Sequence, residues 1–504
     1  MKIPFAPPAG YVSDETTFST AQWVDGNNVR FRMGRAETIG GWSSTMASTL
    51  TGVCRNVLPW ADNDAGINIA FGTHSALMVY VGGALHDITP AALAAGSIDG
   101  AGGGGYGTGT FGTGTYGTSS ASEYYARTWS LATYGQTLIA NPRGGKIYIW
   151  ENNTATPATE IVNAPDDVNT ILVTPDTRQL MAFGCNVEAT GVFDPMCIRW
   201  TDLENIDDWT PSSADNAGEQ ILESGGRIVG AKEMGPYLLV WTDTSLYVAQ
   251  FIGDPSQTFR FDLVSSNCGL LGPNAATVVD QIAYWITPDL IPYRFQVGAG
   301  PQPIPCPIRD DFADNMVTTQ AEKLVAFPMA KFGEVWFLYP DERDGIENSR
   351  YIAFNTVEGT WFKGRIARTA AADAGPTQYP VMVTSAGEVF WHENGQSANG
   401  SALEWSVTSG DQYLDNAQQW VMVRGVWPDF EAQVGAVNLT LTLRKYPQAT
   451  TTYTKGPYAL SANQSKRDFM AQGRIVSLTF SGSSAPAFVR FGKPIFDAVA
   501  TGQQ

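Results

Sequence analysis

Four carboxylates gather in one short stretch and come closest, by type and spacing, to a site that could do chemistry. They are Asp202, Glu204, Asp207 and Asp208. Carboxylate oxygens bind Ca²⁺, and a pair of carboxylates can carry out glycoside hydrolysis. The spacing lacks the EF-hand pattern, however, and a sequence does not place two acids across a cleft. A solvated acidic loop is therefore the favoured interpretation, with a metal or catalytic site as the alternative.

The sequence lacks the other common catalytic patterns. Its three histidines, His74, His86 and His392, form no two-histidine helical motif, and no pair of cysteines offers zinc-site spacing. No Gly-x-Ser-x-Gly elbow and no phosphate loop ending in Gly-Lys-Ser or Gly-Lys-Thr occurs. Carboxylates alone can still transfer protons. We therefore expect no enzyme, no cofactor and no bound metal, with a carboxylate-based glycosidase as the remaining catalytic alternative.

Residues 101–118, AGGGGYGTGTFGTGTYGT, form the most unusual stretch of the sequence. Its aromatic residues recur every five positions at Tyr106, Phe111 and Tyr116, and each is followed by Gly-Thr. The stretch matches the dinucleotide-binding glycine pattern, but no strand precedes it and no helix follows it, so we discount that function. A flexible linker is one interpretation. The other is an interaction loop, because a linker gains nothing from regularly spaced aromatic side chains.

The elements that would position these residues are β-hairpins that repeat along most of the chain. The clearest copy lies within 228–252, where two runs rich in apolar, aromatic and β-branched residues flank a turn that carries Asp243 and Ser245. Nothing in this copy has helical spacing. The six further copies are 67–81, 135–150, 179–200, 281–296, 334–362 and 381–391.

Hairpin units that recur at intervals of roughly 30 to 60 residues predict a repeating β architecture. A single hairpin is not stable alone, whereas four-stranded blades around a central channel form a closed repeating array. We therefore predict an all-β fold built on a β-propeller of about six to seven blades. Stacked β-sandwiches are the alternative.

The prediction divides the chain into three parts. Residues 1–50 form an N-terminal segment with strands, which would close the propeller ring. Residues 51–393 form the propeller, with the Gly-rich insertion at 101–118. Residues 394–504 form a C-terminal β domain of sandwich type, because the hairpin repeat stops and alternating strands take its place. Those strands are expected at 401–410, 419–427, 436–445, 474–480 and 487–491.

The charge of the chain is strongly negative and unevenly distributed. The formal net charge is −18, and the stretch 151–225 alone carries 14 acidic and 2 basic residues. Tight binding of DNA depends on lysine and arginine neutralising phosphates, so this chain is a poor candidate for it.

The five cysteines have irregular spacing, which favours free thiols made in a reducing cytoplasm. A contact between Cys185 and Cys197 across one hairpin is the alternative. The sequence shows neither an apolar run long enough to span a membrane nor a secretory signal.

Three stretches carry a resemblance to a known family. The longest is 198–255, which begins IRWTDLENIDDWT and is continued by SSNCGLLGPNAATVVDQIAYWI at 265–286. The others are FSTAQWVDGNNVRFRMGRAETIGGW at 18–42 and QGRIVSLTFSGSSAPAFVRFGKPIFD at 472–497. These stretches resemble the tail nozzle proteins of short-tailed bacteriophages, which are related to tail tubular protein B and are often described only as virion structural proteins. The stretch 101–118 also resembles a loop of that group.

The resemblance implies a structural role in the virion. Six subunits would form a ring at the distal end of a short tail, and each would carry a β-propeller with added β domains. The ring would continue the DNA channel below the head-to-tail adaptor, retain DNA, open for ejection, and dock tail fibres or spikes. DNA would pass the acidic wall without tight binding. The family supplies no catalytic residues to transfer, and the alternative function is a tail-tip propeller that binds a receptor or a glycan.

Overall fold

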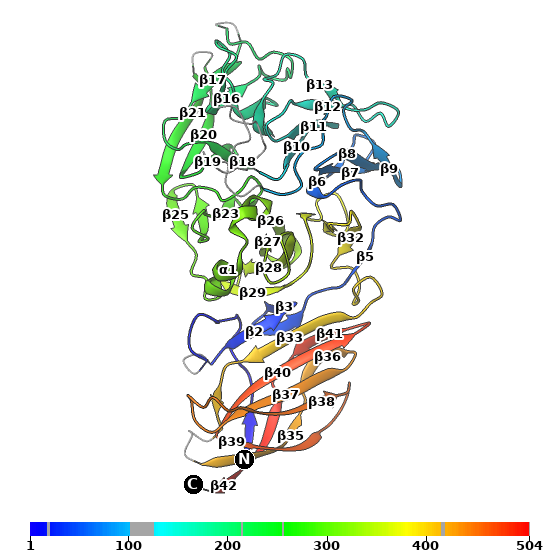
Figure 1. Ribbon diagram of the computed structural model, residues 1–504, viewed down its shortest axis with the longest axis vertical. Coiled ribbons are helices and arrows are strands. Elements are labelled where there is room, and N and C mark those ends of the chain that lie inside the picture. Colours follow the sequence, from blue (N-terminus) through cyan, green and yellow to red (C-terminus); the bar gives the residue numbers. More distant parts are fainter. Residues whose placement is uncertain (18–20, 101–124, 213–214, 255–256, 415–418, 503–504) are drawn as a thin grey trace, which may run out of the picture.

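A computed structural model describes residues 1–17, 21–100, 125–212, 215–254, 257–414 and 419–502 of the chain. The fold is nearly all-β, with 53% strand and 3% helix. Figure 1 shows a β-propeller with a second β domain beside it, and both termini lie at the far end of that second domain. The predicted fold class, a propeller with an appended C-terminal β domain, is confirmed.

Seven four-stranded antiparallel sheets form the blades within the described residues. Blade 1 holds β6 (Cys54–Ala61), β7 (Ile67–Thr73), β8 (Leu77–Val81) and β9 (Ala84–Asp87). Blade 2 holds β10 (Trp129–Tyr134), β11 (Thr137–Pro142), β12 (Tyr148–Trp150) and β13 (Thr159–Glu160). Blade 3 holds β14 (Val168–Val173), β15 (Leu180–Asn186), β16 (Phe193–Trp200) and β17 (Gly218–Ile221). Blade 4 holds β18 (Ile228–Met234), β19 (Tyr237–Thr242), β20 (Ser245–Asp254) and β21 (Gln257–Ser266).

The remaining blades continue the same order. Blade 5 holds β22 (Ala276–Val279), β23 (Ile282–Ile286), β24 (Pro292–Gln296) and β25 (Ala299–Pro303). Blade 6 holds β26 (Val325–Met329), β27 (Glu334–Pro340), β28 (Asn348–Asn355) and β29 (Thr360–Arg365), and is preceded by α1 (Arg309–Asn315) and η1 (Thr318–Lys323). The turn η2 (Ala330–Phe332) joins β26 to β27. Blade 7 holds β30 (Ala370–Ala372), β31 (Val381–Val383), β32 (Val389–His392) and β5 (Trp42–Ser44).

The first strand of each blade lies at the centre of the propeller. These inner strands contact one another in the closed order β6, β10, β14, β18, β22, β26, β30 and back to β6. The predicted hairpins coincide with the second and third strands of the blades, as in β19 and β20, where Leu239 pairs with Val248. Because neighbouring blades cover both faces of these strands, their residues are apolar and mostly buried, which is why the sequence pattern detects them.

The N-terminal segment divides between the two domains. β5 pairs with β32 and places Trp42 opposite His392, so it supplies the outer strand of blade 7. The earlier strands pair elsewhere, which differs from the expectation that the strands of 1–50 close the propeller. They are β1 (Lys2–Pro4), β2 (Trp23–Asn27), β3 (Val29–Arg32) and β4 (Arg35–Thr38), and all four join sheets of the C-terminal domain.

The C-terminal domain consists of three sheets that mix strands from both ends of the chain. Their orders are β1-β42-β35-β39, β3-β4-β41-β36 and β2-β33-β40-β37-β38, with β34 also paired to β40. Their bounds are β33 (Leu403–Ser409), β34 (Gln412–Tyr413), β35 (Trp420–Trp427), β36 (Phe430–Val434), β37 (Val437–Arg444), β38 (Tyr453–Leu460), β39 (Arg467–Gly473), β40 (Ile475–Ser484), β41 (Phe488–Phe491) and β42 (Ile495–Gly502). The alternate residues of β37 are buried, as expected for a strand with one face in a core.

A buried arginine joins the C-terminal domain to blades 6 and 7. Arg30 of β3 donates two hydrogen bonds to the carboxylate of Glu393, at 3.1 and 2.5 Å. Its Nε lies 3.2 Å from Oε1 of Glu334 without hydrogen-bond geometry, while Oε2 of Glu334 accepts from the indole of Trp336 at 2.8 Å. Burial raises the pKa of Glu334 to about 7, against the opposing effect of Arg30. The guanidinium of Arg30 therefore pairs with two buried carboxylates, those of Glu334 and Glu393.

Candidate functional site

The predicted acidic loop connects β16 to β17 on the outside of blade 3. Glu204 and Asp207 are exposed, while Asp202 and Asp208 are half-buried. Oδ1 of Asp208 accepts a hydrogen bond from the backbone N–H of Thr210 at 3.3 Å. Within the described part of the chain, no group of three or more His, Cys, Asp or Glu side chains could hold a metal ion. We therefore describe this stretch as a polar loop in which Asp202 and Asp208 accept hydrogen bonds from backbone N–H groups.

Asp202 links the acidic loop to a groove between blades 3 and 4. Its Oδ1 accepts from the backbone N–H of Asn216 at 2.8 Å. The carbonyl oxygen of Asn216 accepts from the indole of Trp200 at 2.8 Å and from the hydroxyl of Thr258 at 3.0 Å. Since Trp200 belongs to blade 3 and Thr258 to blade 4, this loop residue ties together two walls of the groove.

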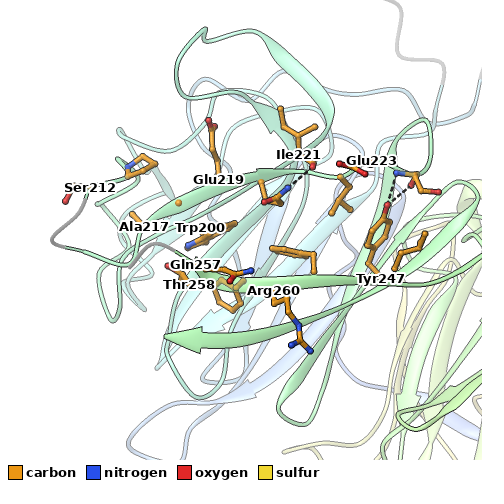
Figure 2. Close-up of a pocket in the computed structure, with 18 residues that line it drawn as sticks. Trp200, Ser212, Ala217, Glu219, Ile221, Glu223, Tyr247, Gln257, Thr258 and Arg260 are labelled. Carbon is orange, nitrogen blue, oxygen red and sulfur yellow. Dashed lines mark hydrogen bonds between the residues drawn. The ribbon is translucent and has the colours of Figure 1, made fainter. Parts of the chain in front are cut away.

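The groove has a volume of about 950 Å³ and lies where the outer strands of the two blades approach each other (Figure 2). Its floor is aromatic: the ring of Trp200 meets Phe259 edge-on at 5.3 Å and Phe261 at 6.0 Å between centroids. Position 218 requires glycine, because a Cβ there would lie 2.5 Å from the indole of Trp200. At the other end, the hydroxyl of Tyr247 accepts from the backbone N–H of Ser224 at 2.7 Å.

The rim of the groove combines apolar and charged side chains. Ile221 and Leu263 are 43% and 50% exposed, which is high for aliphatic side chains. Glu219, Glu223 and Arg260 add charge along the rim. The strands β17 and β21 each pair on one side only within the described residues. Open strand edges beside apolar surface suit the binding of an extended segment of a partner, because its backbone can add to the sheet.

A buried ion network surrounds η1, on the side of the propeller where the inner strands β6 and β26 begin. The ammonium group of Lys323 is fully buried and lies 2.7 Å from Oδ1 of Asp99 and 2.9 Å from Oε1 of Glu347. Arg55 of β6 pairs with the same glutamate at 2.6 Å. Burial opposes the charge of Glu347, but the hydrogen bonds from Arg55 and Lys323 hold its pKa below the ordinary value. This network joins β6 to η1, and removal of one of its partners would leave a buried charge uncompensated.

The remaining sequence predictions concern the interaction loop, the cysteines and membrane spans. The interaction loop with Tyr106, Phe111 and Tyr116 lies outside the described residues. All five cysteines are free thiols, and burial raises the pKa of Cys54 and of Cys306 to about 12. No helix in the described part of the chain is long and apolar enough to cross a bilayer.

The sequence reasoning missed the groove, because its walls come from different blades. Trp200 and Phe259 carry no recognisable motif, although Trp200 lies in the stretch 198–255, which has the longest resemblance to nozzle proteins. The signal that could have indicated this surface is the presence of the apolar residues Ile221 and Leu263 in the fourth strands β17 and β21.

Comparisons with known proteins find fold similarity but no relative by sequence. No family model and no curated protein matches the chain. A chain of the Mitotic Checkpoint Complex has 10% sequence identity and a TM-score of 0.43, and the match covers 69% of this chain and 94% of that one. The β-propeller domain of Cps50 (Swd1) from Myceliophteria thermophila has 9% identity and a TM-score of 0.42, with 70% and 99% covered. The computationally designed protein Ika8 has 12% identity and a TM-score of 0.39, with 73% and 98% covered. The number and closure of the blades rest on the strand pairing described above.

Proposed function

We propose that this chain is a structural subunit of a bacteriophage short tail, a nozzle protein that continues the DNA channel, retains DNA and opens for ejection. The observation that carries the proposal is the sequence resemblance together with its placement in the fold. The stretches 18–42 and 472–497 lie at opposite ends of the sequence, yet they meet in the C-terminal domain, where Glu37 of β4 is opposite Arg490 of β41. Two of the three stretches that carry the resemblance thus belong to one structural unit.

The partners in this proposal are further copies of the chain in a six-fold ring, the head-to-tail adaptor, and the tail fibres or spikes. We propose the groove between blades 3 and 4 as the place where a fibre or spike docks. Its exposed Ile221 and Leu263 and its two open strand edges support that assignment. The protein is proposed to have no enzymatic role, to be made in the host cytoplasm and to reside in the virion tail.

Immunogold electron microscopy of virions tests the proposal. Antibodies raised against the purified chain are expected to label the distal end of the tail, while preimmune serum leaves it unlabelled. Labelling of the capsid alone, or absence of the chain from purified virions by mass spectrometry, would contradict a nozzle role.

The assembly state gives a second test. We expect the purified chain to sediment as a monomer or weak oligomer at micromolar concentration and to form rings only on the tail adaptor. A stable hexamer without any partner would contradict this part of the proposal.

A receptor-binding or glycan-binding propeller is the second candidate function, favoured by the aromatic floor of the groove. Aromatic faces beside polar side chains suit the apolar faces of sugar rings. A glycan array distinguishes the two candidates: saturable binding that is lost in a Phe261→Ala variant favours the glycan binder. The nozzle proposal expects no such binding.

A further inference from the structure

A groove in the C-terminal domain lies where the edges of two sheets meet. Within the described residues, β38 ends one sheet beside β37, and β39 ends another beside β35. The two edge strands are neighbours in the domain that carries both termini (Figure 1), since the ring of Tyr458 on β38 stacks on Phe469 of β39 at 4.6 Å between centroids. The groove has a volume of about 380 Å³ and is lined by residues of these four strands and by Lys445, which follows β37.

The groove exposes large apolar side chains. Met470 of β39 is 71% exposed, and Tyr453 of β38 is 47% exposed. Trp420 and Met422 of β35 are half-buried, and because Met422 pairs with Gln472 they share one face of the sheet with Met470. The solvent-facing side of an antiparallel sheet is usually polar. An apolar strip on that side is typical of a surface that a partner covers.

Two lysines beside this strip have no carboxylate partner. Lys445 and Lys455 are exposed, line the groove, and form no ion pair with any residue that the structure describes. The stretch 432–496 carries eight basic residues and one acidic residue, Asp468, which pairs with Lys466 at 2.6 Å. The groove therefore combines uncovered apolar surface with positive charge that its surroundings do not neutralise.

This combination narrows the class of ligand. A lysine on an open edge strand also discourages unwanted strand pairing, but that role does not account for the uncovered Met470 beside it. Methionine adapts to apolar groups of different shape, and the ammonium of lysine pairs with a carboxylate without a fixed orientation. A nucleic acid needs a row of cations along its backbone, and the net charge of −18 repels a polyanion. A peptide with a few carboxylates meets neither obstacle.

We propose that this groove binds a segment of a partner protein in which one bulky apolar side chain is flanked by acidic residues. The apolar side chain would pack against Met422 and Met470, and the flanking carboxylates would pair with Lys445 and Lys455. The open edges of β38 and β39 add backbone groups to which an extended segment can hydrogen-bond. The inference does not depend on the role of the chain in a tail.

Fluorescence anisotropy tests the proposal with the full chain and a labelled peptide that has phenylalanine between two pairs of glutamates. We expect saturable binding at about 50 mM salt that weakens at about 300 mM, because salt screens the attraction between charges. Lys445→Gln and Lys455→Gln should each weaken binding about two- to fivefold, as for exposed ion pairs, and the double variant about tenfold. Met470→Ala should weaken it several-fold. All three side chains are exposed, so the variants should keep the unfolding temperature of the parent chain.

The controls separate the groove from general attraction to positive charge. Lys331→Gln removes an exposed lysine of η2 that forms no ion pair in the described part of the chain, and it should leave binding unchanged. A peptide with serine in place of phenylalanine should bind at least about fivefold more weakly. The proposal is overturned by equal loss in the Lys331 variant, by equal binding of the serine peptide, or by the absence of saturation at about 300 μM chain.

Two further outcomes would assign the groove to another occupant and overturn the proposal. One is displacement of the peptide by single-stranded DNA at a lower concentration than unlabelled peptide, which would show that the lysines prefer phosphate. The other is self-association of the chain in sedimentation that the double lysine variant abolishes, which would make a second copy the partner.

Discussion

Replacement of Arg30 by methionine tests whether the junction between the two domains depends on one buried cation. Arg30→Met keeps most of the apolar stem but leaves Glu334 and Glu393 without their partner. Both carboxylates are almost fully buried, with side-chain exposures of 1% and 7%. We therefore expect a large loss of stability at the junction.

The size of that loss follows from burial and depends on pH. Removing one partner of a buried ion pair costs about 3–5 kcal/mol, because the remaining charge stays uncompensated. The pKa of Glu334 is raised from 4.5 to about 7 in the folded protein, so its protonated form is favoured there. The stability that comes from burying Glu334 in its protonated form is therefore fully present below pH 4.5 and is lost as the pH rises through about 7. The effect of Arg30→Met should accordingly be larger at pH 8 than at pH 5.

Thermal unfolding followed by differential scanning fluorimetry measures the effect. At about 2 °C per kcal/mol for a large domain, the variant should lose about 6–10 °C at pH 8. Arg35→Met is the matched control, since Arg35 pairs with Glu431 at a half-exposed site and should change little. Glu334→Gln removes one of the two carboxylates that share Arg30. It should make the unfolding temperature less dependent on pH without lowering it at pH 8. The reasoning is refuted if Arg30→Met and Arg35→Met behave alike at pH 8.

Three further predictions follow from other parts of the molecule. Gly218→Ala should destabilise the chain by about 1–3 kcal/mol and shift tryptophan emission, because the new Cβ would overlap the indole of Trp200; unchanged unfolding and emission would contradict the groove geometry. Ellman's reagent should modify fewer than one thiol per native chain within an hour and all five after denaturation, since four of the five thiols are buried and burial raises the pKa of Cys54, Cys268 and Cys306. Filter binding at about 150 mM salt should detect no duplex DNA complex tighter than about 10⁻⁴–10⁻⁶ M, and nanomolar binding would contradict a channel wall that DNA slides past.

The sequence predicted the parts of the fold whose pattern is local. Second and third strands of the blades, such as β19 and β20, are continuous apolar runs joined by short turns, so their positions follow from residue types. Fourth strands such as β25 carry mostly exposed residues and have no comparable signal. The sequence analysis expects an N-terminal strand to close the propeller, and Trp42–Ser44 does so in blade 7. No local pattern shows that β1 to β4 pair with strands of the C-terminal domain instead.

The functional surfaces were harder to predict because they combine distant residues. Arg55 meets Glu347 across 292 positions of the sequence, and Arg143 meets Glu322 across 179. Pairings of this kind depend on the closed ring of blades and not on the spacing of residues. The acidic loop was found by composition alone, and the hydrogen bond by which it contributes to the groove, from the backbone N–H of Asn216 to Asp202, has no sequence signature.

The division of the C-terminal domain between both ends of the chain has a consequence for biosynthesis. Lys2 of β1 pairs with Asp497 of β42, so the ribosome adds about 495 residues (497 − 2) between the two partners. At about 5–20 residues per second, the N-terminal strands wait roughly 25–100 s for their partners while the propeller forms between them. During that interval their edges are open to other nascent chains. A ribosome that stops before β33 would release a propeller that carries β1 and β2 without their strand partners and the β3–β4 hairpin without β41, and such products are expected to aggregate.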